Sequence, residues 1–409
     1  MWVAREHRSK YLRWSSAVSD ISSLTRAVDN TAEQVEIGLD GPSADLVFVF
    51  ISSHHSPSYY SVVELVHSRF PGATVIGCSA GGVIGAGHEV EKTPGVAMTA
   101  ASLPGVVITP FEFESDELPS PDAAPSAWEA LIGVPASDHP SIVLLPDPFT
   151  IPSDALVEGL DYAYPGSVKI GGLASGGTVN GANALFSNKG TRRSGAVGVA
   201  LSGNVVIDSV VAQGCRPIGT PMVVTGADDN VITELSGELP LDVLRNLFEE
   251  GDEREKRLIR RSLQIGVLMD PFQDEYEAGD FLIRNVIGAD GDNGALAVGE
   301  RIREGQVVQF HVHDASSASN DLGASLMRYA SDHPDASPSG VLLFTGLGRG
   351  ERLFGRADHD TDLLQSVVGS MPITGFFCNG EIGPVGGSTF LHGYTSSFAL
   401  FRPKEPAAV

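Results

Sequence analysis

The sequence has few cysteines, few positive charges and no long hydrophobic run. Three cysteines in 409 residues exclude a disulfide framework and a zinc site of the CxxC type, and they favour a reducing cytoplasm. Lysine and arginine total 27 against 51 aspartates and glutamates, so the formal net charge of -24 would repel nucleic acid and anionic membrane surfaces. The longest apolar run, Leu46 to Ile51, is far shorter than the roughly 20 residues of a membrane-spanning helix.

The remaining composition, with 42% hydrophobic and 19% charged residues, is that of a folded protein. Several basic side chains lie among the first 14 residues, but the apolar segment of a signal peptide does not follow them. We therefore expect residues 1–14 to form a basic tail.

One pattern occurs three times along the chain: an apolar strand, a helix, a second strand, a glycine turn and a hairpin. The first strands of the three copies lie within 45–52, 141–150 and 340–350. Two glycines five positions apart follow the second strand in each copy, at Gly77 and Gly82, Gly171 and Gly176, and Gly375 and Gly380. Crossover helices imply parallel strands, and the hairpins imply antiparallel additions. We expect an α/β fold with mixed parallel and antiparallel sheets.

A different pattern separates the second and third copies. Residues 239–263 predict two helices with apolar residues three and four apart and dense charge on the opposite face. This predicts two domains after the tail. The first, 15–238, holds two copies, and the second, 239–403, holds the helical pair, short strands and the third copy.

The glycine turns are the expected place for chemistry, because ligands bind where parallel strands end. The first turn matches the GxSxG nucleophile elbow around Ser79, but no helix follows, and the other copies have Leu173 and Phe377 at that place. The same turn has the GxxxxG spacing of a P-loop but has Val83 in place of the lysine. The GLGRG segment could hold an anion with Arg349.

The third glycine turn carries the most polar groups, which could either line a pocket or satisfy the turn itself. Its candidates are Cys378, Asn379, Gly380, Glu381, His392 and Thr395. His54 follows the first strand and could reach the same cleft. His311 and His313 share one face of a predicted strand, but no third ligand with metal spacing lies near them, so we predict no metal site.

The chain resembles the FIST proteins, which have an N-terminal and a C-terminal FIST domain. The resemblance rests mainly on GFFCNGEIGPVGGSTFLHGYTSSFALF, with support from IGCSAGGVIG, IGGLASGG and FTGLGRGERLFG. It implies an intracellular sensory module that binds small ligands, with amino acids as candidates. Relatives pass the signal to attached kinase, cyclase, chemotaxis or F-box domains. No such segment is evident here, so we expect a separate signalling partner.

Three classes of function stay open. In the favoured class, a sensor without enzymatic activity binds an amino acid or a similar small polar metabolite. Arg349 would suit a carboxylate of this ligand, and Cys378, Asn379 and Glu381 would suit an ammonium or an amide. Gly380, His392, Thr395, Ser79 and His54 complete the predicted site. A hydrolase using Ser79 or Cys378 would need a histidine base within hydrogen-bond reach. A scaffold could assemble through strand edges or the helical pair.

No cofactor is predicted. Some FIST proteins are described as haem-binding, which keeps haem as a minor alternative, but the chain has no CxxCH motif. The sequence does not determine the ligand, the partner or the oligomeric state.

Overall fold

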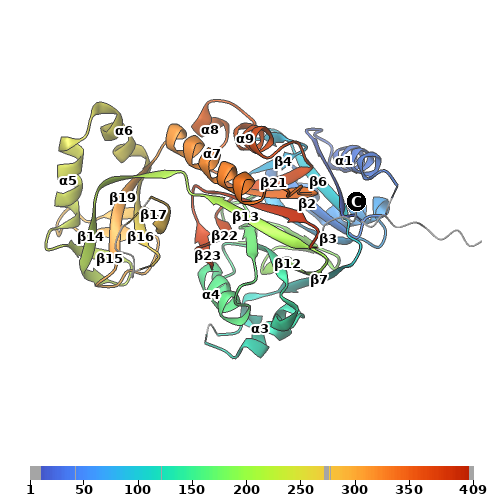
Figure 1. Cartoon of the computed structure of the whole chain (residues 1–409), viewed down its shortest axis with the longest axis horizontal. Coiled ribbons are helices and arrows are strands. Elements are labelled where there is room, and N and C mark those ends of the chain that lie inside the picture. The colour runs from blue at the N-terminus through green and yellow to red at the C-terminus, as the bar shows by residue number, and fades with distance from the viewer. Residues whose placement is uncertain (1–10, 42, 121, 271–275, 277, 405–409) are drawn as a thin grey trace, which may run out of the picture. The chain divides into compact units, whose positions relative to one another are not determined.

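The computed structural model describes residues 11–404 except 42, 121, 271–275 and 277. The chain forms two compact units. The first consists of residues 1–211, 323–391 and 395–409, and the second consists of residues 212–322 and 392–394 (Figure 1). The second unit therefore begins earlier than the boundary expected near residue 239. The strand β1 (Arg13–Ser19) includes the last two residues of the segment expected to be a tail, and residues 1–10 lie outside the described residues.

Three six-stranded sheets build the first unit. In the order in which the strands pair, the first sheet consists of β1, β6 (Val96–Ser102), β2 (Leu46–Ser52), β3 (Thr74–Ala80), β10 (Leu185–Ser187) and β11 (Gly190–Arg192). The second consists of β7 (Val106–Phe113), β12 (Ala196–Gly203), β8 (Ser141–Pro146), β9 (Lys169–Gly172), β22 (Glu381–Val385) and β23 (Ser388–His392). The third consists of β13 (Val206–Ala212), β24 (Ser396–Arg402), β20 (Gly340–Gly346), β21 (Ile373–Cys378), β4 (Gly82–Gly85) and β5 (His88–Val90).

The same pairing recurs in each sheet. The pairs β2 with β3, β8 with β9, and β20 with β21 are parallel, and the strands on either side of each pair are antiparallel to it. The mixed α/β fold class is thus confirmed.

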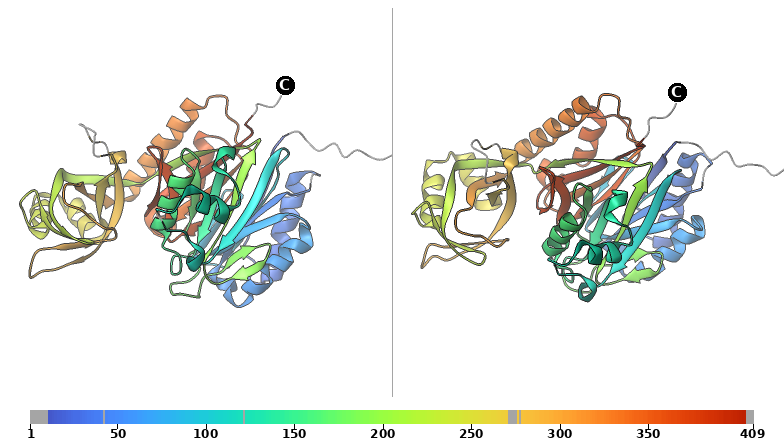
Figure 2. Two further views of the ribbon diagram at one scale, coloured as in Figure 1. Left: turned by 90° about the horizontal axis from the view of Figure 1, so that it is seen from below. Right: turned by 60° about the horizontal axis from the view of Figure 1, so that its bottom comes forward.

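Helices cover the sheets of the first unit (Figure 2). They are α1 (Leu24–Leu39), α2 (Val62–Arg69), α3 (Pro125–Ile132), α4 (Ser153–Ala163), α8 (Glu351–Phe354) and α9 (His359–Val367), with α7 (Ala315–Asp332) spanning the boundary between the units in sequence. Successive residues of a strand point to opposite faces of the sheet and pack into different hydrophobic cores. Phe50 of β2 joins Val143 and Phe344 in a core shared by all three sheets, whereas Val49 packs beneath α1 and α2. Burial on both faces explains the unbroken apolar runs of these strands.

The first glycine of each copy is required by the parallel pair. A Cβ atom on Gly77, Gly171 or Gly375 would overlap a backbone carbonyl oxygen of the neighbouring parallel strand. No side chain fits at these three positions, which explains why the glycine recurs.

The second glycine of each copy lies where two copies meet. A Cβ atom on Gly82 would lie 2.8 Å from Phe377, one on Gly176 would lie 2.6 Å from Ser79, and one on Gly380 would lie 3.0 Å from Leu173. Strand pairing follows the same order, because β4 pairs with β21, β10 with β3, and β22 with β9. Each copy therefore adds strands to the sheet of another copy, and the three copies close into a ring.

The second unit is a closed barrel with two helices. Its strands, in pairing order, are β14 (Cys215–Asp228), β15 (Val231–Leu235), β18 (Leu296–Val298), β17 (Phe281–Ala289), β16 (Leu263–Leu268) and β19 (Val307–His313). The helices α5 (Pro240–Glu250) and α6 (Glu253–Ser262) match the predicted helical pair, and they contribute Val243 and Ile259 to the barrel core. In the described part of the chain, no helix has the length and apolar character needed to cross a membrane.

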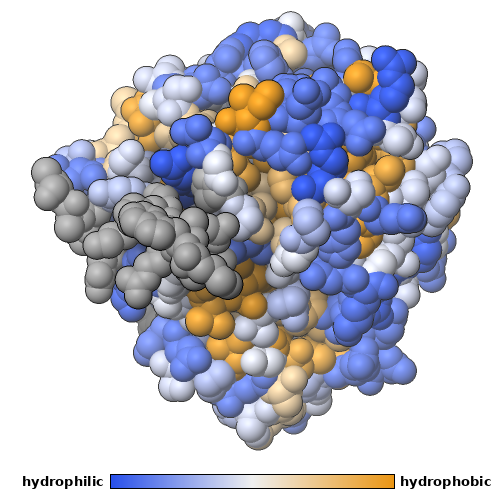
Figure 3. All heavy atoms as spheres, turned by 90° about the vertical axis from the view of Figure 1, so that its right-hand side faces the viewer, coloured by the Kyte–Doolittle hydropathy of each residue, from blue (hydrophilic) through white to orange (hydrophobic). Residues whose placement is uncertain are grey.

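One face of the molecule is largely polar. The face in Figure 3 shows mostly hydrophilic residues, interrupted by smaller hydrophobic patches. This agrees with the high content of acidic residues.

Candidate functional site

A buried ion pair lies beyond the end of β20. The Arg349 side chain is fully buried, and its Nε and Nη2 atoms donate to the two carboxylate oxygens of Asp360 at 3.0 and 2.9 Å. Arg349 belongs to the loop after β20, and Asp360 belongs to the first turn of α9. Such a bidentate pair has the geometry that best offsets the cost of burying two charges.

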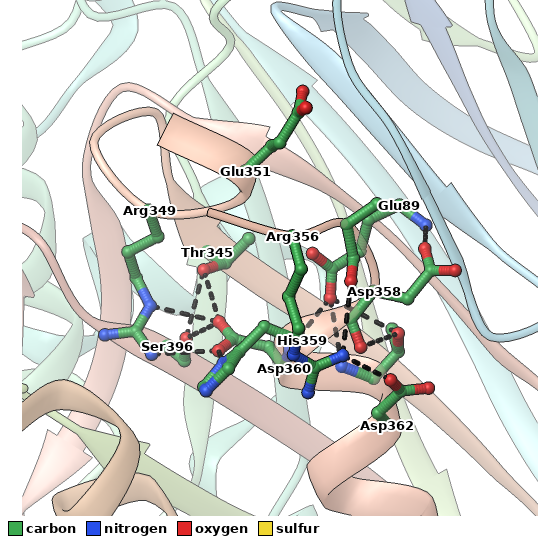
Figure 4. A network of polar contacts seen from close by, with 12 residues as sticks. Glu89, Thr345, Arg349, Glu351, Arg356, Asp358, His359, Asp360, Asp362 and Ser396 are labelled. Atoms are coloured by element: carbon green, nitrogen blue, oxygen red, sulfur yellow. Dashed lines mark hydrogen bonds and ion pairs between the residues drawn. The ribbon is translucent and has the colours of Figure 1, made fainter. Parts of the chain in front are cut away.

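Asp360 is the centre of a larger network (Figure 4). Thr345 Oγ1 and Ser396 Oγ donate to its Oδ2 atom, and His359 Nδ1 lies 2.8 Å from Oδ1. Burial by itself would raise the pKa of Asp360, but Arg349 and the hydrogen bonds from His359 and Ser396 outweigh burial and hold this pKa well below its usual range. Asp360 is therefore a carboxylate at neutral pH.

Glu381 lies near this network, but unlike Asp360 it is protonated at neutral pH. The backbone N–H of Thr395 donates to its Oε2 at 3.0 Å, and Cys378 Sγ lies 3.4 Å from its Oε1. Burial raises the pKa of Glu381 to about 8 and also raises the pKa of the Cys378 thiol. Both groups are mainly protonated at neutral pH.

Glu89 connects the network to another part of the sequence. It lies on β5, and its Oε1 accepts hydrogen bonds from the backbone N–H groups of Asp360 and Thr361 at 2.9 and 3.0 Å. In return, the Glu89 N–H donates to Asp358 Oδ1 at 2.6 Å. Glu89 thus satisfies N–H groups at the start of α9 that have no partner within the helix. Burial, followed by the charges of Asp360 and Asp358, raises the pKa of Glu89 to about 8.

A cavity of about 400 Å³ lies beside Glu89. Four acidic residues line it, together with His88, Thr93, Val18, Val90 and Ala357; the acids are Asp20, Glu89, Glu91 and Glu351. Lys92 Nζ lies 2.5 Å from Glu351 Oε2 and compensates part of this negative charge. Glu89 therefore belongs both to the cavity wall and to the Asp360 network.

The structure brings together four of the residues predicted to form the site. Arg349 and Glu381 interact electrostatically, and Cys378 and Thr395 are the hydrogen-bond partners of Glu381. None of these four is among the residues that line the 400 Å³ cavity. The Arg349 guanidinium is hydrogen-bonded to Asp360 in the first turn of α9, so we interpret Arg349 as a residue that stabilises the start of this helix.

The other predicted site residues lie elsewhere. Asn379 is exposed, Gly380 packs against Leu173, and His54 is exposed with its Nδ1 atom 3.4 Å from Ser52 Oγ. His392 belongs to the second compact unit.

Ser79 has a structural set of hydrogen bonds. Its Oγ accepts from the backbone N–H of Ala184 at 2.9 Å, lies 3.4 Å from Asn183 Oδ1 and interacts with Tyr59. Within the described residues, no histidine is a hydrogen-bond partner of Ser79 or Cys378. The base that a hydrolase would need is therefore not in place at either residue.

The histidine pair of β19 is buried. His311 Nδ1 contacts the Gln309 carbonyl oxygen at 3.0 Å, and burial lowers the His311 pKa to about 4. Among the described residues, no group of three or more His, Cys, Asp and Glu side chains could hold a metal ion.

Sequence reasoning missed Asp20, Glu89, Glu91, Glu351 and Asp360. The HEVEK segment carried a signal, since Glu89 and Glu91 alternate at and just after the short strand β5, but nothing in the sequence joined it to α9. The contact between Glu89 and Asp360 spans 271 positions.

The first unit thus combines three mixed sheets with a buried charge network, and Glu89 joins that network to the wall of the 400 Å³ cavity. Residues 45–238 match the FIST N domain and residues 240–384 match the FIST C domain, so the chain belongs to the FIST family. FIST domains are generally described as sensory domains that bind small ligands in signalling. The family boundary coincides with the predicted boundary near residue 239, whereas the compact units divide the chain at residue 212.

Relatives of similar length are known. The chain is 39% identical over 404 residues to an uncharacterized protein of Mycobacterium tuberculosis, covering 95% of this chain and 100% of that one. It is 38% identical over 393 residues to an uncharacterized protein of Mycobacterium bovis, covering 95% and 99%. A solved structure of cyanuric acid hydrolase from A. caulinodans aligns over 95% of this chain and 99% of that chain, with a TM-score of 0.37 and 9% identity.

Proposed function

We propose that this protein is a sensor for an amino acid or a similar small polar metabolite, which binds in the cavity beside Glu89. The observation that carries the proposal is the position of this cavity. Its volume of about 400 Å³ lies within the roughly 300–1,000 Å³ of small-molecule sites, and its wall shares Glu89 with the network around Asp360.

Glu89 provides the route from ligand to protein. Its Oε1 holds the N–H groups of Asp360 and Thr361, so a ligand that changes the charge or position of Glu89 changes the start of α9. Asp360 also anchors Thr345 on β20, Arg349 on the loop after β20, and Ser396 on β24. A separate partner protein that distinguishes the two states of this region would pass the signal on.

The proposal is tested by measuring binding to the full chain. Thermal-shift and calorimetric titrations would use amino acids, small amines and small organic acids. A ligand at 100 times its dissociation constant should add about 2.7 kcal/mol to the free energy of unfolding. We expect saturable binding without turnover, and we expect Glu91→Gln to weaken it.

Asp335→Asn is the matched control, because Asp335 is an exposed acid that lines a different cavity of about 600 Å³. Binding that is insensitive to Glu91→Gln but lost in the control would place the site elsewhere. The absence of binding across all three chemical classes would refute the sensor.

A further inference from the structure

The helix α6 carries a dense group of positive charges in a strongly acidic protein. Its ten residues include five basic and two acidic side chains, whereas the whole chain has a formal net charge of -24. Ile259 is buried in the barrel core, and Leu258 packs against that core. Arg257, Arg260 and Arg261 are exposed to solvent. The helix therefore presents an apolar side to the barrel and a basic side to the surroundings.

Most of these cations lack a carboxylate partner. Arg254 pairs with Asp314 at 3.1 Å. Among the described residues, the other four basic residues of α6 form no ion pair: Lys256, Arg257, Arg260 and Arg261. Instead, Lys256 Nζ and the Arg260 guanidinium lie 5.9 and 4.7 Å from the centre of the Phe248 ring. Their charges are therefore available to an anion from another molecule.

The stability of α6 does not account for all of these charges. Arg260 and Arg261 lie in the last turn, where a positive charge interacts favourably with the helix dipole. Lys256 and Arg257 lie before this turn and gain little from the dipole. Arg257 also lies four positions before Arg261, a spacing at which like charges destabilise a helix. A group of cations that weakens its own helix fits a binding surface better than a structural role.

The charges around α6 determine which anion fits. Glu255 is paired with Arg216 at 3.0 Å, whereas Glu249, Glu250 and Glu253 are exposed. Nucleic acid or an anionic membrane would extend well beyond the helix and would be repelled by the acidic remainder of the chain. At physiological ionic strength, exposed charges more than about 8 Å apart are largely screened from one another. A short anionic segment lying on α6 would therefore be attracted by the arginines and would avoid most of that repulsion.

We propose that α6 is a docking surface for a short acidic segment of a partner protein, whose carboxylates bind Arg257, Arg260 and Arg261. A guanidinium group binds a carboxylate through two parallel hydrogen bonds. Residues three and four positions apart on a helix have Cβ atoms about 5–6 Å apart. Alternate residues of an extended peptide lie about 7 Å apart on one side, so a carboxylate at every second residue matches the arginines. This surface is separate from the cavity beside Glu89, and the proposal does not depend on a ligand there.

Fluorescence anisotropy of the full chain with a labelled peptide tests the proposal. The peptide has eight residues in which glutamate and serine alternate, and its control peptide has glutamine in place of each glutamate. We expect the glutamate peptide to bind more weakly as salt is added, and the glutamine peptide not to bind. Arg257→Gln with Arg261→Gln should weaken binding roughly tenfold, because two charge pairs are lost. Both positions are exposed, so the variant should fold, which circular dichroism would verify.

The matched control removes two positive charges elsewhere. Arg303→Gln with Arg328→Gln changes exposed positions outside α6 and lowers the net charge of the chain by the same amount. This variant should bind the glutamate peptide as the unchanged protein does. Equal weakening in both double variants would assign binding to the overall charge and overturn the proposal, as would the absence of binding at low salt.

Two further measurements test other occupants of α6. Duplex DNA or vesicles containing phosphatidylserine that bind more tightly than the peptide, and lose binding with Arg257→Gln and Arg261→Gln, would replace the partner protein with a polyanion. Sedimentation that shows dimers of the unchanged chain, but monomers of the same double variant, would replace it with a second copy of this chain.

Discussion

Glu381 should make the protein less stable as the pH rises from about 5 to about 8. The residue is 1% exposed, and burial raises its pKa from 4.5 to about 8. Between these values the folded state holds one proton more than the unfolded chain. The free energy of unfolding is therefore highest below about pH 4.5 and falls as the pH rises through 8.

The magnitude follows from the proton difference. One proton corresponds to about 1.4 kcal/mol for each pH unit, so the loss between pH 4.5 and pH 7 is about 3 kcal/mol. Glu381→Gln removes this contribution, because the amide stays neutral at every pH. The amide oxygen can also accept the N–H of Thr395, as the carboxyl group does.

Urea unfolding at several pH values between 5 and 8 would measure the effect. The free energy of unfolding of Glu381→Gln minus that of the unchanged protein should increase by about 1.4 kcal/mol for each unit by which the pH rises. Glu89 contributes a slope to both proteins, so its contribution cancels in the difference. Asp335→Asn should show no such gain, since Asp335 is exposed. Curves for Glu381→Gln and the unchanged protein that run parallel would show that Glu381 is not buried as a neutral acid.

Three further predictions concern stability. Gly375→Ala should cost about 3 kcal/mol or more in urea unfolding, because its Cβ atom would overlap a carbonyl oxygen of β20, whereas Gly323→Ala on α7 has room and should be neutral or stabilising. Arg349→Met should cost about 3–5 kcal/mol by leaving Asp360 buried without its cation, and adding Asp360→Asn should restore part of the loss; no restoration would contradict the ion pair. Ser79→Ala should cost about 1–3 kcal/mol through a lost buried hydrogen bond and leave ligand binding unchanged; loss of binding by a folded variant would bring Ser79 into the site.

The local elements were predictable because their signals are local. Strand β2 lies within the apolar run expected at 45–52, and the charged pair of helices follows residue 239. The recurring glycines marked strand ends, and the reason for the first glycine is a contact with the adjacent parallel strand. Apolar periodicity and glycine placement reflect the backbone of a few neighbouring residues, so they can be recognised without the fold.

The extent of the second unit was not predictable in the same way. The strand β14 lies before the predicted boundary, yet it pairs with β19 and belongs to the barrel. Composition changes at the helical pair, whereas the barrel is closed by strands more than 80 positions apart, as the pairing of Cys215 with His313 shows.

In the candidate site, too, some features were predictable from the sequence and others depended on the fold. Glycine turns and polar residues near strand ends predicted Arg349, Cys378, Glu381 and Thr395 as site residues. The structure places these four near one another, but none of them lines the cavity beside Glu89. The sequence did not reveal that Asp360 would neutralise Arg349.

By itself, the sequence determined the α/β class, the elements of the three copies and the family, because each depends on short patterns of apolar, glycine and polar residues. Only the tertiary structure decided how the copies close into a ring and how the hairpin with Glu89 meets α9. These contacts join residues up to 295 positions apart, as the pairing of Gly82 with Phe377 shows. Their partners are selected by burial and hydrogen bonding in the folded chain, which leave no mark on the neighbouring sequence.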